Sequence, residues 1–323
     1  MHSANRRTVL AMGAAMLTAG AARGQDFPSQ TIRVVVPYPP GGVVDPTARL
    51  LATPLAAVLG QSVVTDNRPG AAGAIGIAAV AQAKPDGHTL LYHSSTISTS
   101  ATVQHESAKI DVQSVLTPVA LVGSSPFLID VHPSVPVKNI QELIAYAKAN
   151  PGKLNYGSSG RGSSNHLAAE LFKRMAGVDI VHVPFQGGGP ALNARIAGTI
   201  QVGFDTITGT AQLIKAGRLR GLAVTGMQRS QAVPDMPTVH ESGVPNYDVT
   251  FWLGYFAPAN TPAATVNKIA GAVREATLKP DVVEKFASLG IDRSNASPEQ
   301  FASLFRGEIE KWDKLLKSLG NAM

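Results

Sequence analysis

Four short loops carry the residues that could do chemistry, and each is rich in glycine or in hydroxyl side chains. They span residues 39–45, 94–96, 157–164 and 186–190. Backbone N–H groups and serine or threonine hydroxyls bind anions, and a helix that begins directly after such a loop adds the positive end of its dipole. We therefore expect an anion-binding site, although loop 39–45 taken alone is explained equally well as an ordinary strand-to-helix turn.

The same loops lack the groups that catalysis would need. Loop 157–164 has the glycine spacing of a phosphate-binding loop, but Ser163 stands where that motif requires lysine. Ser159 is not part of a G-x-S-x-G elbow, because Arg161 stands where the second glycine would be. The histidines include no pair at i, i+4, and the His-Glu pair at 105–106 lacks the second histidine of a zinc motif. We expect no catalytic residue, no metal and no cofactor.

Composition narrows the class of protein further. The chain has 323 residues with 31 Gly, 22 Pro and no Cys, so disulfides, thiolate metal sites, a cysteine nucleophile and a lipid anchor on cysteine are all excluded. The formal charge of +6 includes Arg6, Arg7 and Arg23. Without them 25 basic residues face 22 acidic ones, which is too mild an excess to indicate nucleic-acid binding.

The first 24 residues differ from the rest. Arg6 and Arg7 precede a short segment of small apolar residues, and candidate cleavage sites follow Ala22 or Gly24. We interpret residues 1–24 as a signal peptide and expect a periplasmic protein. The run from Asn5 also resembles a twin-arginine signal, so both this route and the Sec route stay open.

The elements that must position the loops begin with a strand at 32–36. Its β-branched run is typical of a strand covered on both faces, and Pro37 ends it. Asp45 followed by Pro46 predicts an N-cap and the first position of a helix that ends near Leu59.

This order of strand, small-residue loop and helix recurs along the chain. Further strands are expected at 62–65, 88–92, 153–156, 178–183, 201–204 and 221–225, and helices at 139–149, 165–175, 191–197 and 211–216. The turn at 66–76 is expected to open another helix, which ends near Ala83. Alternating strands and helices predict an α/β fold with right-handed crossovers, in which ligands bind where the loops meet at one edge of the sheet.

The chain also indicates two domains. Apolar runs at 119–122 and 127–129 are separated by 123–126, where we place a crossing into a second domain, and a strand at 250–257 returns to the first. Helices at 263–278, 280–289 and 298–319 complete the chain. The predicted limits are 25–122 with 251–323 for the first domain and 123–250 for the second.

Six ordered motifs together resemble a known family. They are VVVPYPPGGVVDPTAR (34–49), DNRPGAAG (66–73), PDG (85–87), NYGSSGRGSSNHL (155–167), VPFQGGGPA (183–191) and FAPANTP (256–262). The chain resembles Bug-type receptors, the periplasmic solute-binding components of tripartite tricarboxylate transporters. The resemblance implies a type II periplasmic binding-protein fold, with two α/β domains around a ligand cleft joined by two crossing strands. It also implies a non-enzymatic monomer whose partners are a small organic carboxylate and membrane permease subunits.

The resemblance and the loop chemistry together give the candidate ligand-binding residues. They are Tyr38, Gly41, Gly42, Asp45, Ser94, Ser158, Ser159, Arg161, Gly162, Ser163, His166, Gln186 and Asp205.

Several of these residues have a second interpretation. Asp45 and Asp205 could be plain helix or turn caps, and His166 could close a local hydrogen-bond network. Arg161 could point into solvent or could pair with a second carboxylate and so favour a diacid. Phe251 and Trp252 could line the cleft or pack in the core. A receptor that feeds a signalling protein and an enzyme on the same fold remain alternatives to transport.

Overall fold

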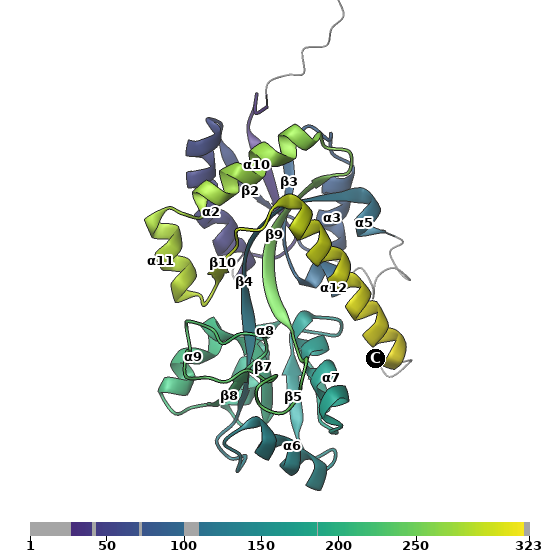
Figure 1. Cartoon of the computed structure of the whole chain (residues 1–323), viewed down its shortest axis with the longest axis vertical. Helices are drawn as coiled ribbons and strands as arrows, with labels where there is room; N and C mark the ends of the chain where they lie inside the picture. The colour runs from purple at the N-terminus through teal and green to yellow at the C-terminus, as the bar shows by residue number, and fades with distance from the viewer. Residues whose placement is uncertain (1–26, 41–42, 71–72, 100–109, 186, 320–323) are drawn as a thin grey trace, which may run out of the picture.

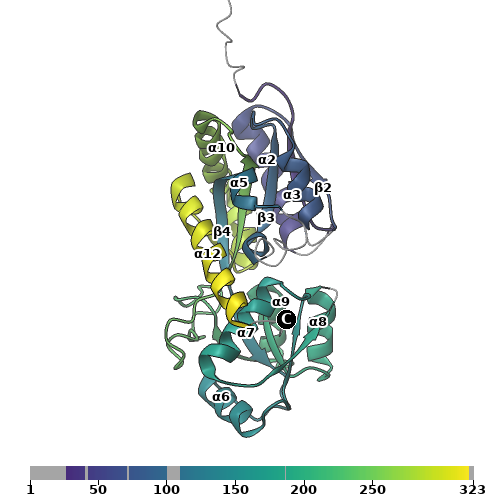
Figure 2. The same ribbon diagram turned by 90° about the vertical axis from the view of Figure 1, so that its right-hand side faces the viewer.

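The computed structural model describes residues 27–40, 43–70, 73–99, 110–185 and 187–319. The predicted signal peptide, residues 1–24, lies outside this part of the chain, as do three predicted site residues, Gly41, Gly42 and Gln186. Within the described residues, no helix is long and apolar enough to cross a membrane. The described residues form two lobes, one above the other in Figures 1 and 2.

The first lobe is built on a sheet in the order β2-β1-β3-β9-β4, in which β1, β2 and β3 are parallel. Its strands are β1 (Ile32–Val36), β2 (Val63–Asn67), β3 (Thr89–Ser94), β9 (Thr250–Pro258), the first part of β4 (Leu116–Val131) and the short β10 (Asp292–Arg293). Its helices are α2 (Val44–Leu59), α3 (Ala74–Ala81), α5 (Val112–Val115), α10 (Ala263–Ala276) and α11 (Pro280–Ser288). The short α5 and β10 were not predicted.

The second lobe repeats the design with the sheet order β4-β7-β5-β6 and β8 beside β4. Its strands are β5 (Asn155–Ser158), β6 (Val181–Pro184), β7 (Val202–Thr206) and β8 (Arg220–Val224), and its helices are α6 (Ile140–Ala149), α7 (Ser164–Ala176), α8 (Gly188–Ile196) and α9 (Ile207–Lys215). The predicted starts of α8 and α9, at 191 and 211, were too late. Their first turns contain glycine and threonine, which favour loops when local sequence alone is considered.

Two long strands connect the lobes (Figure 1). β4 pairs with β9 from Leu116 to Pro126, and from Phe127 onward it pairs with β7 and β8 of the second lobe. The predicted interruption at 123–126 was wrong, because β4 continues through it and absorbs the irregular residues as register shifts. The limits of the two domains remain a prediction.

Each lobe has its own hydrophobic core. In β1 the side chains alternate between two clusters: Val34 and Val36 pack with Leu51 of α2, and Val35 packs with Ile77 of α3. This confirms the prediction that β1 is covered on both faces. The second lobe has a separate cluster between its sheet and helices α6 and α7.

Helix α12 (Pro298–Leu319) contacts both lobes. Phe301 and Phe305 pack around Trp252 and Phe256 of the first lobe. Trp312 and Leu315 belong to the core cluster of the second lobe. Figure 1 shows the helix descending beside β9 toward α7. The buried apolar residues of α12 therefore span the connection between the lobes.

Candidate ligand-binding site

A cavity of about 450 Å3 lies between the lobes. Its wall is formed at the carboxyl ends of β1, β3, β5 and β7 and at the start of α8, the edge at which the sequence predicted a site. The lining residues are Tyr38, Val43, Val44, Ser94, Thr96, Phe127, Ser159, Ser163, Ser164, Asn165, Gly188, Gly189, Leu192, Asp205, Thr206, Gly209 and Phe251.

The predicted site residues divide into three groups. Those that line the cavity are Tyr38, Ser94, Ser159, Ser163 and Asp205. Those that are described but lie outside its lining are Asp45, Ser158, Arg161, Gly162 and His166. The third group, Gly41, Gly42 and Gln186, lies outside the described residues. Arg161 is exposed, whereas Ser158 and His166 are buried behind the loop that lines the cavity.

Four helices direct their N-terminal ends into the cavity. Their N-cap or first-turn residues Val43, Ser163, Gly188 and Thr206 belong to its lining. No side-chain cap is present at these four described helix starts, so the first N–H groups are not used by N-cap side chains. Each helix start carries a partial positive charge of about +0.5. The cavity therefore favours a negatively charged group.

The second lobe contributes the loop between β5 and α7, which its own side chains hold in shape. The Ser158 hydroxyl accepts a hydrogen bond from Gly160 N at 3.1 Å and lies 2.6 Å from His182 Nε2. Asn165 Oδ1 accepts from Ser159 N at 3.2 Å and lies 2.7 Å from Ser163 Oγ. With Oδ1 used inside the loop, the Nδ2 group is what Asn165 can offer to a ligand.

His166 closes this network from behind the loop. Its Nδ1 accepts a hydrogen bond from Gly162 N at 3.1 Å, and its ring lies 4.1 Å from the ring of His182. Burial, reinforced for His166 by the neighbouring His182, lowers the pKa of both rings to about 4. A neutral His166 can accept the Gly162 bond, so its contacts fit the interpretation of a local structural role.

The first lobe contributes Tyr38 and the end of β3. Tyr38 Oη lies 2.9 Å from Ser94 Oγ and 3.2 Å from His93 Nδ1, and that nitrogen donates to Ser94 O at 2.9 Å. Burial raises the pKa of Tyr38 to about 12. Tyr38 is therefore protonated at neutral pH and available as a hydrogen-bonding group on the wall.

Asp45 stabilises this wall from outside the cavity. Helix α2 begins at Val44 with Val43 as its N-cap, so the predicted N-cap role of Asp45 was wrong. The Asp45 carboxylate accepts from Arg49 Nε at 3.0 Å and from Asn67 Nδ2 at 2.8 Å. Asn67 Nδ2 also donates to Tyr38 O at 3.1 Å, which links the carboxylate to the residue that lines the cavity.

Asp205 belongs to a buried ionic cluster. Its Oδ2 accepts from Arg195 Nη2 at 3.0 Å, and Arg195 Nε lies 2.5 Å from Asp130 Oδ1. Arg195 and Asp130 are fully buried. Burial raises the pKa of Asp130 to about 7 and also raises that of Asp205. Sequence reasoning missed Arg195 and Asp130; the signal was an acidic residue directly after the apolar run of β4.

The remaining lining residues are mostly apolar. Phe127 and Phe251 pack edge to face with ring centroids 6.2 Å apart, and Leu192 of α8 adds to the wall. Phe251 thus lines the cavity, while Trp252 is buried in the core. Asn165, Phe127 and Leu192 were missed by the sequence analysis, since only the fold brings them to this cavity.

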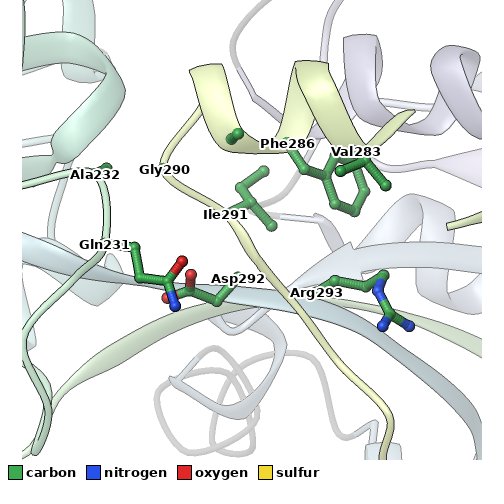
Figure 3. A pocket seen from close by; sticks show the side chains of 9 residues that line it. Gln231, Ala232, Val283, Phe286, Gly290, Ile291, Asp292 and Arg293 are labelled. Atoms are coloured by element: carbon green, nitrogen blue, oxygen red, sulfur yellow. The ribbon is translucent and has the colours of Figure 1, made fainter. Parts of the chain in front are cut away.

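A second cavity, of about 340 Å3, lies away from the predicted loops (Figure 3). Val283 and Phe286 of α11 and Asp292 and Arg293 of β10 line it, with Gln231 of the second lobe beside Asp292. None of the predicted site residues lies among its lining residues. The 450 Å3 cavity is therefore the candidate site.

Comparison with known proteins places this geometry in a family. The family model of the tripartite tricarboxylate transporter family receptor, TctC, matches residues 47–321. Protein BugT of Bordetella pertussis (strain Tohama I) is 33% identical over 318 residues, which cover 97% of this chain and 98% of BugT.

Two solved structures superpose on nearly the whole molecule. Rpa4515 of R. palustris, solved with adipate, is 34% identical with a TM-score of 0.80 and covers 91% of this chain and 99% of its own. MatC (Rpa3494) of Rhodopseudomonas palustris, solved with bound malate, is 33% identical with a TM-score of 0.78 and covers 90% and 99%. The chain belongs to the tripartite tricarboxylate transporter receptor family, as a Bug-type receptor with the α/β periplasmic binding-protein fold.

Proposed function

We propose that this receptor captures a small organic carboxylate in the 450 Å3 cavity and delivers it to the permease subunits of a tripartite tricarboxylate transporter. One observation carries the proposal: four helix starts without side-chain caps meet serine and threonine hydroxyls around one cavity, from both lobes. N–H groups and hydroxyls arranged in this way bind carboxylates. The known ligands of two relatives, adipate and malate, support the same class.

The hydrogen bonds available are sufficient for useful affinity. A micromolar dissociation constant corresponds to about −8 kcal/mol. Hydrogen bonds to a charged group contribute about 1.5–3 kcal/mol each, so several of them supply this binding energy. The cavity is lined from both lobes, which favours closure around the ligand, and Thr96 Oγ1 already lies 3.1 Å from Ser164 Oγ across the gap.

The proposal also covers the location of the receptor, its oligomeric state and the chemical fate of the ligand. We infer that the mature receptor acts in the periplasm as a monomer and releases its ligand chemically unchanged. The predicted signal peptide and the family support the location. Mass spectrometry of ligand incubated with the receptor should recover it intact, and turnover beyond one equivalent would favour an enzyme instead.

A thermal-shift screen over mono-, di- and tricarboxylic and aromatic acids tests the binding function. A ligand at 100 times its dissociation constant stabilises the folded state by about 2.7 kcal/mol, which gives a clear rise in melting temperature. Matched amides, in which the carboxylate is neutral, serve as controls and should not stabilise. A screen in which no acid outperforms its amide would contradict the proposal.

A further inference from the structure

One acidic side chain lines the cavity, although its four helix starts favour a negatively charged group on the ligand. Among the described lining residues, Asp205 is the sole acid, and none is a lysine, arginine or histidine. The helix starts and hydroxyls are available for a carboxylate. Asp205 presents a different group, a hydrogen-bond acceptor with negative charge.

The Asp205 carboxylate is held in place by two hydrogen bonds, but some of its acceptor positions are unused. Arg195 Nη2 donates to Oδ2 at 3.0 Å, and Thr206 N donates to Oδ1 at 3.3 Å. An ionised carboxylate has about four acceptor positions. These two bonds leave capacity for a donor in the cavity, and the side chain is 16% exposed.

Arg195 cannot serve the ligand in place of Asp205. It is fully buried, lies outside the cavity lining and is shared between Asp130 and Asp205. Two carboxylates therefore face one guanidinium, so the cluster has no spare positive charge for a ligand anion.

Gly188 leaves access to the acceptor. A Cβ atom at this position would lie 3.5 Å from Ser159 Oγ and 4.0 Å from Asp205 Oδ1. Ser159 and Asp205 therefore flank one point at the start of α8, where the absence of a side chain leaves room for a ligand group. The nearby wall formed by Phe127, Leu192 and Phe251 is apolar and offers no competing donor.

We propose that the ligand carries, in addition to its carboxylate, a polar hydrogen on a hydroxyl or ammonium group, and that Asp205 binds this hydrogen. Asp205 is then the residue that selects hydroxy acids or amino acids over the unsubstituted acid. A matched acid without the donor leaves a desolvated carboxylate with an open acceptor position. This inference depends on the proposed carboxylate-binding function.

Titration calorimetry with matched acids tests the selection. The probes are butyrate with 4-hydroxybutyrate and 4-aminobutyrate, succinate with malate and aspartate, and hexanoate with 6-hydroxyhexanoate and 6-aminohexanoate. In at least one set the donor-bearing acid should bind about 10- to 150-fold more tightly than its parent, the range for a hydrogen bond to a charged group. The hydroxyl and ammonium members show which donor is preferred.

Asp205→Ala should remove this preference, because the variant has no carboxylate left to accept the donor hydrogen and none left unsatisfied by the parent acid. Asp205→Leu has a similar side-chain shape but no hydrogen-bond acceptor, and it serves as the test if the alanine variant does not fold. Asp292→Asn is the matched control, because it removes one negative charge from the separate cavity in Figure 3. It should keep the preference.

Two results would overturn the inference: parent acids that bind as tightly as their donor-bearing partners, or a preference that persists in Asp205→Ala. In both results acids still bind, so the carboxylate function survives. Failure of every acid, both in these sets and in the thermal-shift screen, would instead reject the proposed function itself.

Discussion

The two walls of the cavity hold their hydrogen-bonding groups in different ways. The second lobe uses a loop that is tied together from inside by neutral groups, among them Ser158, Asn165 and His166. The first lobe uses Tyr38, which is anchored from outside through Asn67 to the charged pair of Asp45 and Arg49. The second wall depends on buried groups. In the first wall Asp45 is also buried, but its partner Arg49 is 52% exposed.

This difference predicts unequal tolerance to change. A buried polar group that loses its partner costs about 1–3 kcal/mol, while a solvent-exposed ion pair contributes about 0–1 kcal/mol. Variants in the second wall should therefore lower stability and affinity together. Variants of Asp45, Arg49 or Asn67, which anchor the first wall, should change stability and affinity only slightly.

The largest effect is expected for Arg195→Met, which acts behind the second wall. It leaves Asp130 and Asp205 buried without their cation, and removing one partner of a buried ion pair costs about 3–5 kcal/mol. Urea unfolding at pH 8 should show this loss. The loss should shrink at pH 5, because burial already raises the pKa of Asp130 to about 7 and protonation removes the unpaired charge. An equal loss at both pH values would contradict the charge argument.

His166→Leu should show the next largest effect. It keeps an apolar side chain of similar burial but leaves Gly162 N without its acceptor, at a cost of about 1–3 kcal/mol at pH 7.5. Affinity for a bound acid should fall with it.

Lowering the pH should narrow the difference in unfolding free energy between His166→Leu and the wild type. The folded-state pKa of His166, about 4, is below the ordinary value of 6.5, so stability is present above pH 6.5 and is lost as the pH falls toward 4. At pH 5 this loss approaches 2 kcal/mol in the wild type and is absent from the variant. A gap that does not change between pH 7.5 and pH 5 would show that the ring is not held neutral by burial.

Much of this site could be predicted from the sequence because its local patterns are strong. The β-branched run of β1, ended by Pro37, required a buried strand followed by a turn. Residues at the carboxyl ends of the strands of each lobe face the space between the lobes, which is why Ser94 of the first lobe and Ser159 and Asp205 of the second line a common cavity.

Other features depend on contacts between distant segments and could not be predicted. Arg195 has the appearance of an ordinary helix-surface cation, and only the packing of α8 on β7 buries it beside Asp130. The stretch 123–126 has the composition of a turn, but pairing with β9 keeps it extended. Asp45 precedes a proline, as an N-cap residue often does, but it lies inside α2 and accepts a hydrogen bond from Asn67 instead of capping the helix.

Tyr38→Phe tests the first wall where it meets the cavity. The variant loses the contact of the hydroxyl with Ser94 Oγ, at 2.9 Å, and should be less stable by about 1 kcal/mol. Thermal unfolding without ligand measures this loss of stability, and unfolding with a stabilising acid shows whether ligand binding changes as well. A loss as large as that of Arg195→Met would show that the two walls do not differ in tolerance.

Asp45→Asn should have the smallest effect on stability and affinity. It decides whether Asp45 anchors Tyr38 through Asn67 or binds the ligand directly. The side chain keeps its size and can still accept from Asn67, while the attraction to the half-exposed Arg49 is lost. Asp45 is buried, but the partner that loses its attraction is half-exposed and the bond from Asn67 is kept, so stability should fall by about 1 kcal/mol. Because Asn67 still contacts Tyr38 O, affinity should fall by less than about 5-fold, the equivalent of 1 kcal/mol.

Asp66→Asn is the matched control, since Asp66 pairs with Arg68 at 2.8 Å on the neighbouring strand β2 and does not line the cavity. It should change stability by a similar amount and leave affinity unaltered. If Asp45→Asn instead weakened binding more than 10-fold with no change in stability, the carboxylate would act on the ligand directly. The first wall would then be a binding surface organised by charge, and the difference in tolerance between the two walls would disappear.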